Sequence, residues 1–538
     1  ISSYKALIPL SKLKALEDES DLQNLVDFKC DTCANCPNCK ASARLRTKSV
    51  QEEFEQSIIQ KSVRVDLEKE KVFVDLPFIK DPVNFLTDFH KAPSNYKQAL
   101  KFFHVQCRKG KDVKEQLRLV HKDLVDKGFM SKLSDLPPEL QKEINTAPFR
   151  HFYPWRSVLK ADSLTTPVRI VVNPTITGLN LILAKGVNMI GKIPEVLTRF
   201  RIGKFAWGSD VSKLYNQLFL NPKSLCYSLF LFHDSLDVSI PPTVWVMTRA
   251  WYGVSSTGNQ AGVALEMLAN QFRTELPLAL APLTDNRYVD DILGQCSSLA
   301  ERDEQISQTQ QCLAKGGFKL KFVAKSGSPP PPNASSDGET VGCLGLKWNT
   351  LADTLSPGFK ADFSLSSTKL PKEALYLNLA ESESLRKALK EGWFDKTSLY
   401  SRVLSFYDPC GFWSPITVQL KLKMQHLNGM GWHDPIPPEH HEEWIKLFQL
   451  MLNASALSLP RSLVPPQYEG IPSFRLLCLA DAAAECCGTA IYAGLELPDG
   501  SFTSSLVMAR SKLVKNTIPR NELHGVLLAA ETSLMAQS

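Results

Sequence analysis

The chain has 538 residues, with 62 Lys and Arg against 56 Asp and Glu, which gives a formal net charge of +6. Hydrophobic residues make up 43% and charged residues 22%, which excludes a disordered, collagenous or coiled-coil chain, and the length predicts two to four domains. No run reaches the roughly 18 apolar residues of a membrane span, so we expect a soluble protein with no membrane partner. The small positive charge permits a polyanionic partner without requiring one.

Four of the 13 cysteines lie within ten residues, at Cys30, Cys33, Cys36 and Cys39. This usage favours a reduced, intracellular setting with one metal-like cluster. Four thiolates could hold one Zn²⁺ ion, the repeated Cys-x-x-Cys spacing also occurs in iron–sulfur ligation, and free or partly used thiols are the third alternative. Because the chain opens at Ile1 with no signal segment, we expect it to be cut from a longer polyprotein.

The first stretch, residues 1–90, continues with short regular elements. Ser49 followed by Glu52 predicts a helix that begins with a capping box. The alternating runs 63–67 and 72–76 predict a β-hairpin.

From residue 91 to about 325 helical and strand patterns mix without repeats. Period and apolar runs predict a helix over 101–127, a buried strand over 169–172, and a strand that runs into a helix over 205–215. A Pro-rich loop at 326–339 precedes a strand predicted over 341–348.

The C-terminal third begins with helical patterns. We predict helices over 398–406 and 419–425, and Pro-rich connections at 435–438 and 460–466. A new domain follows, with a strand at 476–479 that leads to Asp481.

Two acidic positions stand out for their chemistry. Tyr288-Val289-Asp290-Asp291 has the pattern of a hairpin with both carboxylates at the turn, and Asp210 is expected at the end of a separate strand. Carboxylates brought together from two strands can hold a pair of divalent metal ions for phosphoryl transfer. A solvated Asp-Asp turn is the alternative that these residues alone leave open.

The ordered motifs resemble a known family. Asp210, the Tyr-x-Asp-Asp box and residues 343–348 occur in the order of the retroviral-type reverse transcriptase palm, and several further stretches resemble the polymerase of BEL/Pao-type LTR retrotransposons. Those stretches are residues 166–172, 316–320, 407–411 and 518–523. The resemblance covers roughly residues 100–538 and implies template-directed DNA synthesis from dNTPs.

The resemblance implies a metal site. Asp210 and Asp290 would be the principal ligands of two Mg²⁺ ions, or of Mn²⁺, with Asp291 as the supporting acid and the backbone carbonyl of Val211 as a further ligand. Arginine is suited to bidentate contact with phosphate, and Arg169 matches the arginine that meets the incoming triphosphate.

Lysine candidates for the triphosphate are less specific. Lys160 matches a neighbouring lysine of the family, with a solvated surface lysine as the alternative. Lys319 and Lys321 are both candidates for a second triphosphate-side lysine, and the pattern does not choose between them.

The resemblance also places residues around the sugar and the primer. Tyr215 would exclude a 2′-hydroxyl, with a core aromatic as its alternative reading. Tyr252-Gly253 stands where many relatives have Gln-Gly, and Gly253 would allow close backbone approach to the nucleotide. Leu344 and Gly345 resemble the primer grip, although a buried strand glycine would look the same.

The C-terminal stretch resembles the opening of an RNase H domain. Asp481 would lie on its first strand and Glu522 on its first helix, facing Asp481. Since such sites use a set of usually four acids and two can be placed here, we expect no RNase H activity from this fragment.

The expected fold is an α/β right-hand polymerase followed by a partial RNase H-like domain. The predicted stretches are a Cys-rich region and hairpin (1–90), fingers and palm (91–355), thumb and connection (356–470) and the truncated RNase H-like domain (471–538). Expected partners are an RNA template, a DNA primer, the RNA–DNA hybrid, dNTPs and the protease, integrase and capsid segments of the polyprotein, in cytoplasmic virus-like particles.

Two other functions remain open at this point. A catalytically inactive nucleic-acid-binding derivative would bind duplexes without Mg²⁺-dependent extension. An RNA-directed RNA polymerase would prefer rNTPs, and Tyr215 with the RNase H-like tail argues against it.

Overall fold

The computed structural model describes residues 49–85, 92–107, 113–159, 168–237, 239–332, 334, 337–359, 378, 380–469 and 472–537. The four clustered cysteines and Lys160 lie outside these residues, so what was predicted for them stays a prediction. In the described ranges no helix has the length and apolar character needed to cross a membrane.

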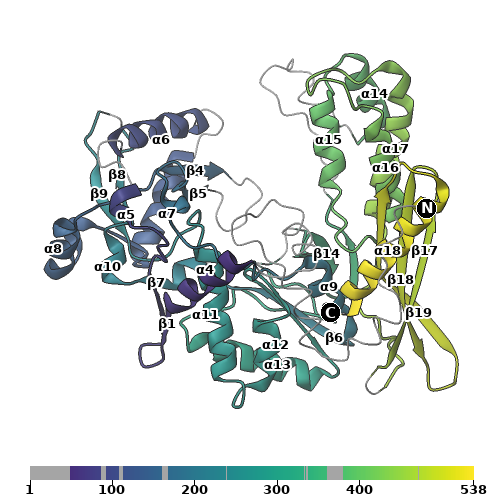
Figure 1. The fold of residues 1–538 in the computed structure, drawn as a ribbon, viewed down its shortest axis with the longest axis horizontal. Coiled ribbons are helices and arrows are strands. Elements are labelled where there is room, and N and C mark those ends of the chain that lie inside the picture. The colour runs from purple at the N-terminus through teal and green to yellow at the C-terminus, as the bar shows by residue number, and fades with distance from the viewer. Residues whose placement is uncertain are drawn as a thin grey trace. The chain divides into compact units, whose positions relative to one another are not determined.

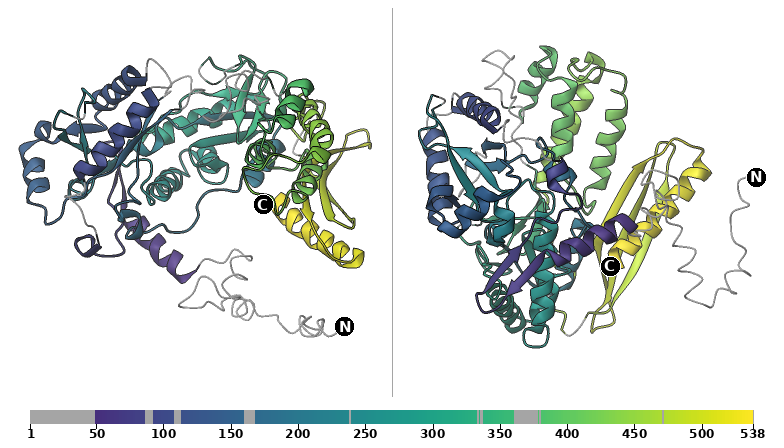
Figure 2. Two further views of the ribbon diagram at one scale, coloured as in Figure 1. Left: turned by 90° about the horizontal axis from the view of Figure 1, so that it is seen from above. Right: turned by 60° about the vertical axis from the view of Figure 1, so that its left-hand side comes forward.

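The chain divides into two compact units. One contains residues 1–189 and 213–267, and the other contains residues 190–212 and 268–538. The chain therefore passes between the units three times, each time within the stretch 91–355. Figures 1 and 2 show the elements of both units.

The first unit begins with the predicted helix and hairpin, and both are confirmed. Helix α4 (Val50–Lys61) starts after Ser49, whose side chain and that of Glu52 form the reciprocal capping box. Strands β1 (Val63–Asp66) and β2 (Lys71–Val74) pair antiparallel, and β7 (Leu218–Leu220) joins β2 in parallel.

The rest of the first unit packs helices around two small sheets. The expected helix over 101–127 is described as two helices instead, α6 (Ala92–Cys107) and α7 (Val113–Asp126). One sheet has the order β3-β9-β8 and the other pairs β4 with β5, which confirms the strand predicted at 169–172. Large apolar side chains such as Phe103, Trp155 and Phe230 fill the core. The remaining elements are β3 (Met130–Lys132), η1 (Leu133–Asp135), α5 (Pro82–Phe85), α8 (Pro138–Thr146), β4 (Trp155–Leu159), β5 (Val168–Val172), η2 (Leu179–Leu181), α10 (Pro222–Leu225), β8 (Leu229–Phe232), β9 (Thr243–Met247) and α11 (Thr257–Gln271), which begins in this unit.

The second unit contains the sheet that carries the candidate acids. Its order is β10-β11-β6-β12, all antiparallel, and helices cover it. The strands are β6 (Phe205–Asp210), β10 (Arg287–Tyr288), β11 (Asp291–Cys296) and β12 (Ala324–Lys325), and the helical elements are α9 (Ile193–Ile202), η4 (Pro277–Ala279), α12 (Leu280–Leu283) and α13 (Leu299–Ala314).

A second sheet and a group of helices follow along the chain. The single strand expected over 341–348 is wrong, because the chain reverses at Leu344 and Gly345, both with positive φ, and forms a hairpin. The helix predicted at 398–406 is confirmed, and the one predicted at 419–425 is the end of a longer helix. These elements are β13 (Thr340–Cys343), β14 (Leu346–Asn349), β15 (Thr354–Pro357), β16 (Leu459–Pro460), α14 (Ser382–Lys390), α15 (Lys396–Ser405), α16 (Ser414–Gln425), η6 (Pro438–His440) and α17 (His441–Ser455).

The C-terminal part of this unit is a three-stranded antiparallel sheet with one helix. Strands β17 (Phe474–Ala482), β18 (Cys486–Glu496) and β19 (Phe502–Leu513) pair in sequence order, and α18 (Ile518–Gln537) lies along β17 and β18 (Figure 1). Burial alternates along β18, as expected for a strand with one covered face. β17 is an edge strand and most of its side chains are exposed.

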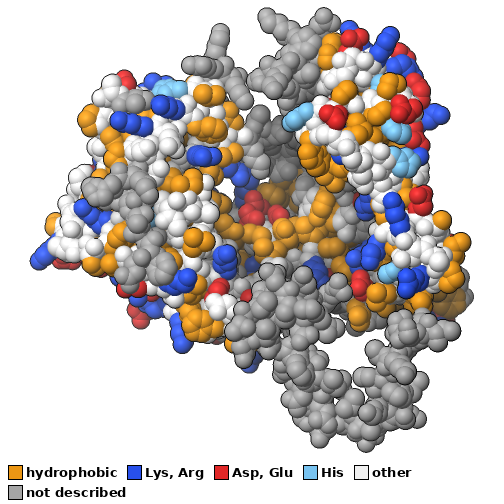
Figure 3. Space-filling view, turned by 45° about the horizontal axis from the view of Figure 1, so that its top comes forward, with side chains coloured by type: hydrophobic (Ala, Val, Ile, Leu, Met, Phe, Trp, Pro, Cys, Tyr) orange, Lys and Arg blue, Asp and Glu red, His pale blue; other side chains and the backbone are white. Residues whose placement is uncertain are grey.

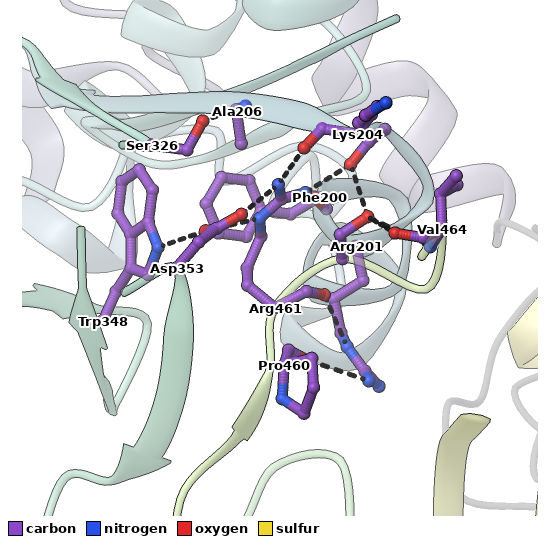
Figure 4. Close-up of polar contacts among 12 residues, drawn as sticks. Phe200, Arg201, Lys204, Ala206, Ser326, Trp348, Asp353, Pro460, Arg461 and Val464 are labelled. Atoms are coloured by element: carbon purple, nitrogen blue, oxygen red, sulfur yellow. Dashed lines mark hydrogen bonds and ion pairs between the residues drawn. The ribbon is translucent and has the colours of Figure 1, made fainter. Parts of the chain in front are cut away.

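Two buried arginines connect these parts of the second unit (Figure 4). Arg461 has no exposed surface; its guanidinium binds both carboxylate oxygens of Asp353 and donates to the carbonyls of Phe200, Gly203 and Lys204. Arg201 donates to the carbonyl of Arg461 at 3.0 Å and to carbonyls of β19. Burial lowers the pKa of Arg201 to about 10, so it stays charged at neutral pH. We call Arg201, Arg461 and Asp353 the buried clamp. It holds the residues directly before β6 in place.

Candidate active site

The three candidate acids of the second unit lie together at one end of its sheet. In the antiparallel pair β6–β11, Asp210 is the register partner of Asp291. Asp290 occupies the two-residue turn of the β10–β11 hairpin, and its backbone carbonyl accepts a hydrogen bond from Val211 N at 2.8 Å. The expected hairpin with carboxylates at its turn is therefore present.

The turn of this hairpin is a strained one. Val289, directly before Asp290, has φ +58°, a left-handed conformation that is a clear outlier for a β-branched residue. Such strain persists only where the surrounding structure enforces it, and it concentrates at functional sites. The strain fits a turn whose purpose is to place Asp290.

The acids lack a full set of compensating partners. Burial and then the negative charge of Asp290 raise the pKa of Asp210 to about 6, and burial with the charges of Asp290 and Asp210 raises that of Asp291 to about 7. Oδ1 of Asp210 is buried and accepts no hydrogen bond from the described residues. The nearest cation is Lys321, whose Nζ lies 3.6 Å from Oδ2 of Asp210.

This donor set suits a hard divalent cation. Carboxylate and carbonyl oxygens are the ligands that Mg²⁺ prefers, and a cation would relieve the repulsion that raises both pKa values. Within the described ranges, no group of three or more His, Cys, Asp and Glu side chains is placed so that it could hold a metal ion. The match to a divalent cation therefore rests on the type of ligand atom and on the buried Asp210 oxygen that accepts no hydrogen bond from the described residues.

The segment after Asp210 differs from the expected helix. The backbone N–H groups of Val211 and Ser212 bond to carbonyls of Asp290 and Lys319, and Lys213 is left-handed at φ +49°. Because the left-handed Lys213 interrupts a right-handed helix, only the 3₁₀ helix η3 (Leu214–Gln217) forms, with Tyr215 in it. The expected α-helix over this segment is wrong for that reason.

Within the first unit, the structure brings several nucleotide-site candidates together. The rings of Tyr215 and Tyr252 lie 4.9 Å apart. Gly253 has φ +104°, and a Cβ there would overlap the carbonyl oxygen of Val172 at the end of β5. The same strand carries Arg169, whose side chain is exposed.

One residue of this cluster was missed in the sequence. Asn180 donates from Nδ2 to the Gly253 carbonyl at 3.0 Å and accepts from Ser255 N at 3.0 Å. It fixes the turn that presents Tyr252 and Gly253. No local pattern around Asn180 signals this contact, because its partners lie more than seventy residues away.

The candidate primer-grip residues form the β13–β14 turn. Leu344 has φ +48° and Gly345 φ +90°, the conformation of a tight two-residue hairpin turn. The side chains of Asp291 and Leu344 line one small cavity together with residues of β6 and β14. Leu344 is buried, so the turn presents its backbone.

The RNase H-like acids are placed less closely. Asp481 lies on β17 and Glu522 is the fifth residue of α18, and both side chains are exposed. α18 meets β17 at Gly525, where a Cβ would lie 3.5 Å from the Asp481 carbonyl oxygen. Between them, Asn521 is fully buried and donates to the carbonyls of Ala483 and Ala484.

The family comparison covers this region. Residues 395–538 match the family described as Pao retrotransposon-like RNaseH-like domain. The resemblance to BEL/Pao-type retrotransposon polyproteins is therefore confirmed. No curated protein sequence matches the chain.

Solved structures of foamy viral protease-reverse transcriptases are also similar to this BEL/Pao-like chain. One, in complex with double-stranded DNA, is 14% identical with a TM-score of 0.47 over 78% of this chain, which spans 60% of that protein. Another, in complex with an RNA/DNA hybrid, is 15% identical with a TM-score of 0.46 over 79% of this chain and 46% of that protein. No residue role follows from similarity at this level.

Proposed function

We propose that the chain is an RNA-directed DNA polymerase of a BEL/Pao-like retrotransposon, which copies RNA into DNA by two-metal nucleotidyl transfer. The observation that carries the proposal is the gathering of Asp210, Asp290 and Asp291 at one sheet end, with the pKa values of Asp210 and Asp291 raised and an unsatisfied carboxylate oxygen on Asp210. The family match of the C-terminal third supports the retroelement origin.

In this proposal Asp210 and Asp290 hold two Mg²⁺ ions, Val211 adds its backbone carbonyl and Asp291 supports them. Bound there, Mg²⁺ lowers the pKa of the primer 3′-hydroxyl and offsets charge on the α-phosphate. Mn²⁺ suits the same oxygen ligands. The protein's part is to keep these oxygens converged before substrate arrives, through the β6–β11 register and the strained Val289 turn.

The remaining roles concern substrate selection. Arg169 contacts the triphosphate, Tyr215 excludes a ribose 2′-hydroxyl, and the Tyr252–Gly253 turn backs the base pair. Of the two candidates for a second triphosphate-side lysine, we choose Lys321 over Lys319, because the ammonium of Lys321 lies beside Asp210.

The partners proposed are an RNA template, a DNA primer, their hybrid, dNTPs and other segments of the polyprotein. On the face in Figure 3, Lys and Arg side chains are interspersed with hydrophobic and acidic ones. Phosphate contacts spread over several such side chains would make binding depend strongly on salt. The right-hand arrangement, with fingers and palm at 91–355 and thumb and connection at 356–470, and the location in cytoplasmic particles belong to the same proposal.

Primer extension on poly(rA)/oligo(dT) with dTTP and Mg²⁺ tests the proposal. Asp290→Asn should abolish extension, while Asp285→Asn, an exposed acid five residues earlier, should leave it intact. Extension that survives Asp290→Asn would contradict the site. Tight duplex binding without extension by the unaltered chain would favour a catalytically inactive derivative.

A further inference from the structure

The β13–β14 turn is held between two other segments of the second unit. A Cβ on Gly345 would overlap ring atoms Cδ1 and Cε1 of Tyr407, so one edge of the ring lies directly against the glycine. On the other side, a Cβ on Gly358 would overlap the Gly345 carbonyl oxygen. A side chain larger than hydrogen at Gly345 or Gly358 would therefore collide with its neighbours.

The segment that follows Tyr407 in the chain is held by several hydrogen bonds. The carboxylate of Asp408 accepts hydrogen bonds from Phe412 N and Trp413 N, each at 2.9 Å, which closes a compact corner before α16. Cys410 O accepts from Ala509 N of β19 at 2.8 Å, and Gly411, at φ +73°, packs against the Ala509 backbone. The backbone directly after Tyr407 is therefore held in place.

Tyr407 also lies beside the hairpin that carries the acids. Its pKa is raised by burial and by the nearby Tyr288 and Cys410 groups. Tyr288 directly precedes the Val289–Asp290 turn. Yet the Tyr407 side chain is 44% exposed, which is unusual for an aromatic ring that touches a strained turn.

We infer that Tyr407 is a positioning residue for the primer strand. Its ring supports the Leu344–Gly345 turn. The backbone of that turn would then hold the primer terminus beside the Asp290 hairpin. The inference rests on the proposed function and deepens it. The substrate concerned is the 3′-terminal part of a DNA primer paired to its template, and a small displacement there is costly, because reacting atoms must be held within fractions of an ångström.

Steady-state extension by Tyr407 variants tests the inference. Tyr407→Ala should raise the KM for primer–template by about tenfold or more, with the KM for dTTP and the thermal midpoint near those of the unaltered chain. Tyr407→Phe keeps the ring and should behave as the unaltered chain does. Leu404→Ala, at a 69% exposed position on the preceding helix, is the matched control and should change nothing.

A double variant tests the contact itself. Gly345→Ala alone should weaken primer use, because the added methyl meets the ring. Combined with Tyr407→Ala, it should cost less than the two single changes together. An unchanged primer KM in Tyr407→Ala, or a loss that Tyr407→Phe does not restore, would overturn the inference.

Failure of the proposed function is recognised separately. If the unaltered chain does not extend a primer, fluorescence anisotropy on a recessed primer–template and on a blunt duplex of equal length decides the inference. A preference for the recessed end that Tyr407→Ala abolishes and Tyr407→Phe keeps would support it. A preference that Tyr407→Ala leaves intact, or none at all, would overturn it.

Discussion

The second unit carries acids in two regions that are built differently. Asp210, Asp290 and Asp291 belong to paired strands and one tight turn, are half-buried, and lie close enough that two of them have strongly raised pKa values. Asp481 and Glu522 belong to an edge strand and a helix, and both are exposed. In the first region burial and the neighbouring carboxylates raise the pKa of two acids, which a bound cation would lower again, whereas the acids of the second region are exposed.

The largest difference between the two regions should appear when the charge of one acid in each is removed. Asp210→Asn should lower kcat for primer extension by about a hundredfold or more, because it removes a carboxylate proposed to hold the Mg²⁺ ions that would offset charge on the α-phosphate. Asp481→Asn should leave extension unchanged. The measurement is steady-state extension on poly(rA)/oligo(dT), and equal losses in the two variants would refute the distinction.

The next prediction concerns how firmly the first region is anchored. Arg461→Ala should lower the free energy of unfolding by about 3 kcal/mol or more, because Asp353 and three buried carbonyls lose their donor. Urea unfolding followed by fluorescence measures it. Arg386→Ala removes an exposed ion pair with Glu442 and should leave the midpoint unchanged; a similar shift in both would show that the buried clamp does not anchor β6.

Local signals explain what the sequence predicted well. The Ser49–Glu52 capping box, the hairpin at 63–76 and the acidic turn at Asp290 depend on neighbours within a few residues. The same holds for the helix at 398–406.

Long-range partners explain what the sequence did not predict. The helix expected after Asp210 is absent: Val211 and Ser212 bond to the Asp290 and Lys319 carbonyls, about 80 and 107 residues away, and Lys213 then takes a left-handed conformation. The strand expected at 341–348 reverses at a turn against which Tyr407 packs, 62 residues on from Gly345. Neither partner can be read from the local pattern.

A third prediction concerns which sugar the nucleotide candidates admit. Tyr215→Ala should raise rNTP incorporation relative to dNTP by about tenfold, because the ring no longer occupies the space of a 2′-hydroxyl. Tyr215→Phe keeps the ring and should keep the discrimination. Competition assays with rUTP and dTTP measure it, and unchanged selectivity in Tyr215→Ala would make Tyr215 a core aromatic.

The smallest effect is expected at another half-buried acid, Asp408, which lies between the two regions in sequence. Burial raises its pKa to about 6, although backbone N–H groups of Trp413, Phe412 and Gly411 oppose the shift. The folded state therefore binds the proton more tightly than the unfolded chain, whose pKa is about 4. The resulting stabilisation is fully present below pH 4 and is lost as the pH rises through 6.

Asp408→Asn removes this titration, so the difference in stability between the variant and the unaltered chain should move in favour of the variant from pH 4 to pH 7. Urea midpoints at each pH give that difference, and any constant cost of the lost carboxylate oxygen cancels from its slope. A flat difference would mean that the N–H donors balance burial, so that Asp408 has the same pKa in the fold as in the unfolded chain. The corner after Tyr407 would then contain a carboxylate whose charge its hydrogen bonds compensate. The acids around Asp210 differ, because their pKa values are raised by burial and by one another.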